Sequence, residues 1–239
     1  MTTTTPMTTT TSEVAKPSAT RADARTTGLL YLGLAITGLL GFLIIRPRLF
    51  APDDPAATLS HLLENEGLAR AGIALELGIV LTQALAALWF FRLFRGVDAF
   101  AAGAIAAFGL VNAVAVLISA ALLAGALEVA IDPVGDAAGI PQLLYVLSDN
   151  LWGVGGLFFG LWLIPMGWCV LRSGSMPRPL GQILVAGGVG YVLSAFARYL
   201  APDAGPLADL LAIPASVGEF WMIGYLLLRG GRSTAAPAA

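Results

Sequence analysis

Residues 99–127 read AFAAGAIAAFGLVNAVAVLISAALLAGAL and contain no charged side chain. This run is longer than the roughly 20 apolar residues that cross a hydrocarbon core about 30 Å thick. Similar runs recur along the chain at 28–45, 71–91, 143–171, 180–200 and 207–228. The sequence therefore predicts an all-α fold, a polytopic membrane helix bundle with six transmembrane helices.

The overall composition supports a membrane protein. Of the 239 residues 57% are hydrophobic and 12% are charged, whereas about 25% of a soluble domain is charged. Mean hydropathy is +0.82. These values exclude an ordinary soluble domain. The arginines are scattered and form no basic stripe, which argues against a nucleic-acid partner. The expected partner is the lipid bilayer.

The ends of the chain are polar. Residues 1–27 hold 11 threonines and no apolar periodicity, so we expect a disordered tail there, with a second short tail at 230–239. Nine of the 13 basic residues fall on the side of the two termini. Because cytoplasmic loops keep positive charge, both termini are expected in the cytoplasm.

The longest connection, residues 46–70, contains a predicted amphipathic helix near 55–66. Asp54 followed by Pro55 is typical of a helix start, and leucines recur at helical spacing after it. The helix should lie on the outer membrane surface. It is either a lid over an outward-facing cavity or a passive connector, and the connector is the favoured interpretation.

The residues most informative about function are the ionisable ones within the spans, since a charge at the bilayer centre costs about 2.5–3.5 kcal/mol even on lenient scales. Four qualify: Glu76, Asp149, Arg198 and Glu219. With helices drawn straight across the membrane, all four fall at one depth near the outer side. We expect Arg198 to neutralise one or two of the carboxylates across the bundle.

Two interpretations of this cluster are open. It is either an outward-facing cavity that binds a small polar or cationic ligand or relays protons, or a buried ion-pair network that fixes helix register. Two neighbouring polar side chains, Asn150 and Tyr191, complete the set of candidate site residues. We expect no metal, no cofactor and no catalytic residue, because no HExxH or GxSxG motif is present. The oligomeric state is not predicted.

Helix packing is predicted from glycines, which let backbones approach closely in membranes. Gly156 and Gly160 form a GxxxG pair, and Gly187, Gly188 and Gly190 are expected to act similarly in the fifth span.

Three stretches, FFGLWLIPMG at 158–167, RSGSMPRPLG at 172–181 and GGVGY at 187–191, resemble the bacterial membrane proteins grouped under domain of unknown function 4386. The resemblance runs from about Arg25 to Arg229. It implies a multi-pass bacterial membrane protein, which we expect in the inner (plasma) membrane, and supplies no established activity. Where the family often has a histidine before the fourth span, this chain has Ser148, Asp149 and Asn150.

The sequence thus predicts an uncharacterised multi-pass membrane protein. The first functional hypothesis is binding or sensing of a small ligand at the polar cluster. The alternatives are a proton-coupled small-molecule transporter and a structural membrane partner without a ligand.

Overall fold

The computed structural model describes residues 20–201 and 205–230, and these form helices with no strand among them. The helices are α1 Arg21–Gly38, the π-helical segment η1 Leu39–Ile45, α2 Arg46–Leu49, α3 Pro55–Glu64, α4 Glu66–Phe94, α5 Ala99–Ile131, α6 Gly139–Ser173, α7 Arg178–Leu200 and α8 Gly205–Arg229. Six are long and apolar enough to cross a membrane, with α1, η1 and α2 acting as one 29-residue span. The predicted all-α bundle of six candidate spans is confirmed.

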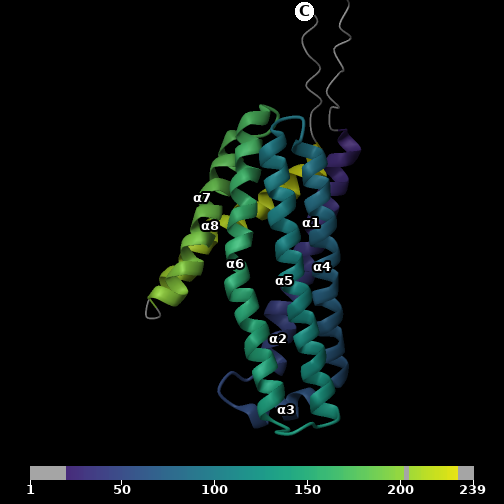
Figure 1. The fold of residues 1–239 in the computed structure, drawn as a ribbon. Coiled ribbons are helices and arrows are strands. Elements are labelled where there is room, and N and C mark those ends of the chain that lie inside the picture. The colour runs from purple at the N-terminus through teal and green to yellow at the C-terminus, as the bar shows by residue number, and fades with distance from the viewer. Residues whose placement is uncertain (1–19, 202–204, 231–239) are drawn as a thin grey trace, which may run out of the picture.

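The spans pack in chain order. Each packs against the next, and α1 also packs against α8, which closes the set into a ring. Figure 1 shows α1 beginning and α8 ending at the same end of the bundle. At that end, Asp23 of α1 pairs with Arg92 of α4 at 2.8 Å. We call this the terminal end, and the opposite end, where α3 lies, the α3 end.

The ring is not uniform along its length. In Figure 1, α7 and α8 lean away from the other helices toward their connection, whereas α4, α5 and α6 run side by side to the α3 end. Large apolar side chains such as Leu81, Val114 and Phe196 are exposed on the outer surfaces. An all-round apolar surface of this kind suits a lipid environment.

The first helix begins earlier than predicted, at Arg21, because a polar cap extends it. Thr20 and Asp23 form a capping box: the Asp23 N–H donates to Thr20 Oγ1 at 3.1 Å, and the Thr20 N–H donates to Asp23 Oδ2 at 3.0 Å. This reciprocal pair satisfies two backbone donors at the helix start. The predicted disordered tail is therefore wrong for residues 21–27. Residues 1–19 and 231–239 lie outside the described part of the chain.

The helix predicted near 55–66 is present as α3, Pro55–Glu64, and its position on the outer membrane surface stays a prediction. α3 begins at Pro55, and the Asp54 carboxylate accepts the N–H of Ala57 at 2.9 Å as an N-cap. Its Leu62 is fully buried, and α3 crosses the α3 end of the bundle (Figure 1). The Gln142 side chain of α6 donates to the carbonyls of Ala51 and Pro52 at 3.0 and 2.6 Å, which fastens the preceding loop.

Close helix packing rests on some of the predicted glycines. A Cβ at Gly160 of α6 would lie 2.5 Å from the carbonyl oxygen of Gly188 on α7, so only glycine permits this approach. The prediction is confirmed for this pair. It is wrong for Gly156, where a Cβ would meet no atom within 4 Å.

Candidate functional site

A buried ion pair joins the first span to α4. Arg46 Nη2 lies 2.9 Å from Glu76 Oε1, and both side chains are more than nine-tenths buried. The guanidinium also lies 5.4 Å from the centroid of the Phe42 ring, a cation–π geometry. Removing two charges from solvent is costly unless they neutralise each other, so this pair requires both members.

The pair is extended by hydrogen bonds from two further helices. Arg46 Nη2 donates to Ser148 Oγ of α6 at 2.8 Å, and Ser148 lies 2.7 Å from Ser119 Oγ of α5. The indole N–H of Trp152 donates to Glu76 Oε1 at 3.1 Å. We call these five residues the Arg46 network. It connects the first span, α4, α5 and α6, so it fixes how four helices align.

The π-helical segment places Arg46 in this network. The Arg46 N–H donates to the carbonyl of Gly41, five residues back, which is the bonding pattern of a π-helix. In a regular α-helix the Pro47 ring would collide with the carbonyl four residues earlier, and the wider turn accommodates it. A π-helical turn contains about one residue more than an α-helical turn. The Arg46 side chain therefore points to a different side of the helix than it would in a regular α-helix.

The prediction that Arg198 neutralises carboxylates of the cluster is wrong for Glu76 and Asp149. The guanidinium that pairs with Glu76 is that of Arg46, and Asp149, half-exposed, lies 3.6 Å from Arg46 Nη1. Arg198 itself is exposed near the end of α7. The reason is the inclination of α7 seen in Figure 1, which carries its end away from α4 and α6.

Glu219 lies apart from the Arg46 network. Its Oε1 accepts a hydrogen bond of 2.6 Å from the Tyr31 hydroxyl. Tyr31 and Arg46 stand 15 positions apart on the same span, which at about 1.5 Å per residue separates them by roughly 20 Å. The predicted single cluster at one depth is therefore wrong, because Glu219 sits opposite Tyr31, nearer the terminal end.

Glu219 faces a cavity of about 340 Å³ inside the ring of helices. Aromatic side chains make up much of its lining: Tyr31, Phe42, Trp152, Phe159, Tyr191 and Phe220. Glu219 is the acidic residue of this lining, and no arginine or lysine of the described chain belongs to it. The cavity is thus an aromatic chamber with one carboxyl group, and we call it the Glu219 cavity.

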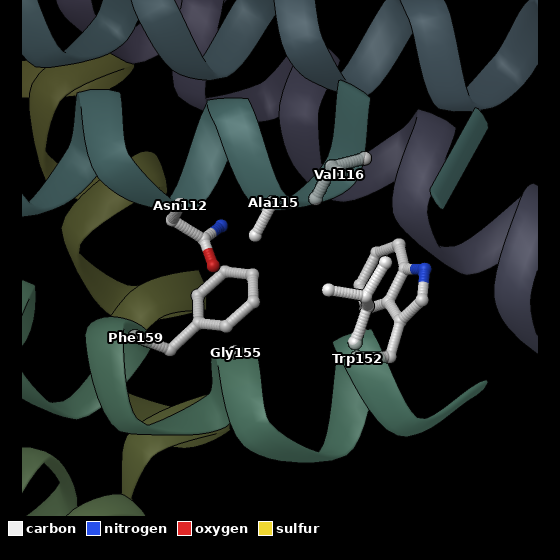
Figure 2. Close-up of a pocket in the computed structure, with 7 residues that line it drawn as sticks. Asn112, Ala115, Val116, Trp152, Gly155 and Phe159 are labelled. Atoms are coloured by element: carbon white, nitrogen blue, oxygen red, sulfur yellow. The ribbon is translucent and has the colours of Figure 1, made fainter. Parts of the chain in front are cut away.

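Trp152 and Phe159 separate the Glu219 cavity from a narrow gap between α5 and α6. Figure 2 shows both rings on α6, with Gly155 between them and Asn112 of α5 opposite. Both rings line the gap as well as the cavity. The same Trp152 ring lies 5.1 Å, centroid to centroid, from Phe42 and bonds to Glu76. It is therefore the side chain shared by the cavity and the Arg46 network.

The other predicted residues divide between these regions. Tyr191 lines the Glu219 cavity, and its ring centroid lies 6.1 Å from that of Phe159. The exposed Asn150 donates to the Val146 carbonyl of its own helix at 2.9 Å, so it belongs to neither region. Within the described residues, His, Cys, Asp and Glu form no group of three or more that could hold a metal ion.

Sequence reasoning missed Arg46, Tyr31 and Trp152. Arg46 was assigned to the loop because it ends an apolar run and precedes Pro47. Its proximity to the hydrophobic boundary was the available signal, since an arginine there has a long side chain that can fold back inward as well as outward. Tyrosine and tryptophan carry a polar group on an apolar ring and commonly find a buried hydrogen-bond partner.

Comparison with known proteins gives one match. The family model described as domain of unknown function (DUF4386) matches residues 26–230, which begins within the first candidate span and covers the other five in full. No curated protein and no solved structure matches the chain. The chain therefore belongs to the family of domain of unknown function 4386, as its sequence motifs suggest.

Proposed function

We propose that this multi-pass membrane protein binds, and thereby senses, a small lipophilic organic cation in the Glu219 cavity. The observation that carries the proposal is the combination of one carboxyl group with an aromatic lining that, among described residues, contains no basic side chain. A carboxylate in an apolar region needs a cation or a proton to offset its charge. Aromatic ring faces attract cations, quaternary ammonium groups in particular.

The size of the cavity suits a small ligand. Its volume of about 340 Å³ is at the lower end of the range of roughly 300–1,000 Å³ for small-molecule pockets. Tyr31 bonds to Oε1 of Glu219 and holds the carboxyl group in place. A monocation with one aromatic or aliphatic group therefore matches both the charge and the volume.

The opening of the cavity suits entry from the bilayer. Among the lining residues, Leu39 and Leu43 of η1 and Phe220 of α8 are 42–61% exposed. These residues belong to the first span and to α8, and α8 leans away from the rest of the bundle toward its connection with α7 (Figure 1). Exposed apolar side chains in this position border lipid, so the ligand is expected to be an amphiphile that partitions into the membrane before it binds.

Binding is better supported than proton-coupled transport. Toward the terminal end, Tyr31 packs edge-on against Phe90 at 5.3 Å between ring centroids, and Phe90 packs against Trp162 at 5.6 Å. All three side chains are at most 2% exposed. A carrier needs access from both faces, and this aromatic layer lies across the route. A purely structural role requires no cavity around Glu219.

We also propose the orientation and location. The excess of basic residues on the side of both termini favours cytoplasmic termini in a bacterial plasma membrane. The α3 end then faces outward. Cysteine labelling from outside intact cells tests this: Gly135→Cys should react with an impermeant reagent and Gly174→Cys should not, each in a Cys169→Ala background.

The test of binding uses a matched pair of probes. Benzyltrimethylammonium and neopentylbenzene have the same shape, and only the first carries a charge. The purified protein in detergent should melt at a higher temperature as benzyltrimethylammonium is added. Neopentylbenzene should give a much smaller rise, and Glu219→Gln should abolish the difference between the two probes.

A control variant tests whether the loss of any carboxylate, or only that of Glu219, changes the response to the cation. Glu64→Gln removes an exposed carboxylate of α3 and should keep the wild-type response. The proposal fails if both probes stabilise the wild type equally, or if Glu219→Gln responds to the cation as the wild type does.

A further inference from the structure

A second hollow lies outside the ring, between α4 and α5 near the α3 end. It has a volume of about 630 Å³ and is lined by these two helices alone. Arg70 of α4 borders it on one side, and Glu128 of α5 and Asp132, the C-cap of α5, border it on the other. We call it the Arg70 groove. It shares no lining residue with the Glu219 cavity.

The charges in the groove lie at the level of the lipid headgroups. Arg70 is in the second turn of α4, which begins at Glu66, and Asp132 is the C-cap of α5. The side chains at both helix ends are exposed. Charged residues at the end of a span reach the polar boundary of the bilayer, so this part of the groove contacts headgroups rather than acyl chains.

The rest of the groove is apolar and leads toward the membrane interior. Ala74 and Leu77 continue the Arg70 face of α4 at helical spacing, and Ala124 continues the Glu128 face of α5. Leu77 is 49% exposed. The small Ala74 and Ala124 leave room between the two helices. A groove that is charged at one end and apolar along the rest of its length is complementary to a phospholipid headgroup with one acyl chain.

The positive and negative side chains of the groove indicate which chemical groups a bound headgroup should carry. Arg70 offers a guanidinium, whose fork geometry suits phosphate oxygens. Glu66 contacts Nε and Nη2 of Arg70 at 2.7 and 2.6 Å. Both side chains are exposed, and because exposed ion pairs contribute little free energy, a phosphate can replace Glu66 as the partner of Arg70. Glu128 and Asp132 offer carboxylates, which accept hydrogen bonds from a primary ammonium. A headgroup with a phosphate and a primary amine satisfies both sides.

We infer that the Arg70 groove is a binding site for an aminophospholipid of the phosphatidylethanolamine type, with the phosphate on Arg70 and the ammonium on Glu128 and Asp132. Phosphatidylcholine lacks the N–H donors that the carboxylates require. Phosphatidylglycerol lacks the positive charge and places its phosphate near two carboxylates. The inference goes beyond the proposed cation binding and does not depend on it.

The experiment compares three phospholipids with identical acyl chains. The full chain is delipidated in detergent, each lipid is added back, and native mass spectrometry measures the bound fraction. Phosphatidylethanolamine should bind roughly tenfold more tightly than either competitor, because it alone makes charge-assisted bonds on both sides of the groove. It should also raise the melting temperature most.

Variants locate the site. The double variant Glu128→Gln/Asp132→Asn should remove the preference, because the ammonium loses its carboxylate acceptors. Arg70→Gln should weaken the binding of all three lipids, because each of them carries the phosphate. Arg48→Gln and Glu64→Gln remove exposed charges near the same end of the bundle and should keep the preference. All four variants change exposed side chains, so folding is expected to persist, and melting curves without lipid verify this.

Other outcomes overturn the inference. Equal binding of phosphatidylcholine or phosphatidylglycerol to the wild type would show that the groove does not recognise an aminophospholipid. Retention of the preference by Glu128→Gln/Asp132→Asn, or an unchanged affinity for all three lipids in Arg70→Gln, would place the lipid site elsewhere. Equal stabilisation by soluble phosphoethanolamine at the same concentration would indicate a site for a free headgroup compound instead of a lipid.

Discussion

Glu76 and Glu219 are both acidic residues within membrane-spanning helices, yet their surroundings differ. Glu76 is enclosed by the Arg46 guanidinium and the Trp152 indole N–H. Glu219 bonds to a neutral Tyr31 hydroxyl and borders a cavity. A carboxylate whose charge is offset within the protein holds helices together, whereas one beside open volume is available for a ligand. The surroundings of Glu76 therefore suit the structural interpretation that the sequence left open, and those of Glu219 suit the ligand binding that we propose.

The largest expected effect is on the Arg46 network. Glu76→Gln leaves the Arg46 guanidinium buried without its main counter-charge. Loss of one member of a buried pair typically costs about 3–5 kcal/mol, and we expect a loss of this size in the free energy of unfolding, measured by denaturant titration in mixed micelles. The double variant Arg46→Met/Glu76→Leu should recover most of the loss, and a single-variant cost below about 1 kcal/mol would contradict this.

Trp152→Phe should have an intermediate effect. It removes the N–H donor to Glu76 while an aromatic ring remains beside Phe42 and Phe159. A lost hydrogen bond to a charged group corresponds to about 2 kcal/mol of unfolding free energy. Because Trp152 also lines the cavity, its replacement should weaken cation binding as well. Unchanged stability would mean that the indole N–H does not support the network.

A smaller effect on stability is expected at Glu219. Glu219→Gln keeps an acceptor for the Tyr31 hydroxyl, so the unfolding free energy should change by less than about 1 kcal/mol. The same denaturant titration measures this change. A loss as large as that of Glu76→Gln would assign Glu219 to a structural role and remove the contrast between the two residues.

The smallest expected effect concerns an exposed ion pair between Asp98, which lies outside the spans, and Arg172 near the end of α6. Asp98 caps α5 and accepts bonds from the N–H of Ala101, the Trp168 indole and Arg172 at 3.0–3.2 Å. The Ala101 N–H, followed by Trp168 and Arg172, lowers the pKa of Asp98 below its usual 3.8. A lowered pKa in the folded state stabilises the fold above pH 3.8 and loses that contribution as pH falls through the lowered value.

Asp98→Asn tests that exposed pair. The variant keeps an N-cap oxygen but cannot titrate, so its melting temperature should depend less on pH below about 4 than that of the wild type. Near pH 7 the two proteins should differ only slightly, as exposed ion pairs generally contribute little. Parallel pH profiles would show that the Asp98 carboxylate does not contribute to stability.

Much of the fold was predictable because apolar runs of sufficient length leave few alternatives in a membrane. The start of α3 followed from Asp54 and Pro55 for a local reason, capping. The early start of α1 has an equally local signal, because Thr20 and Asp23 stand at the spacing of a capping box. Local chemistry is thus sufficient for helices and their ends.

The site was predicted only in part. Glu76, Glu219 and Tyr191 were recognised as candidates, but their partners depend on two non-local features. The π-helical turn before Arg46 changes the face on which that arginine falls, and the lean of α7 and α8 moves Arg198 away from α4 and α6 (Figure 1). Counting residues along straight helices cannot supply either feature. An accurate pairing therefore requires the packed bundle.

The most direct test of the separation between the two acidic residues is a crossed measurement on Glu76→Gln and Glu219→Gln. For each variant, the unfolding free energy and the Kd of benzyltrimethylammonium, by calorimetry on folded protein, are determined in one detergent. We predict that Glu76→Gln loses stability with little change in Kd, and that Glu219→Gln keeps its stability with Kd at least about tenfold weaker. Parallel changes in both quantities for both variants, or an unchanged Kd in Glu219→Gln, would contradict the separation of the two sites.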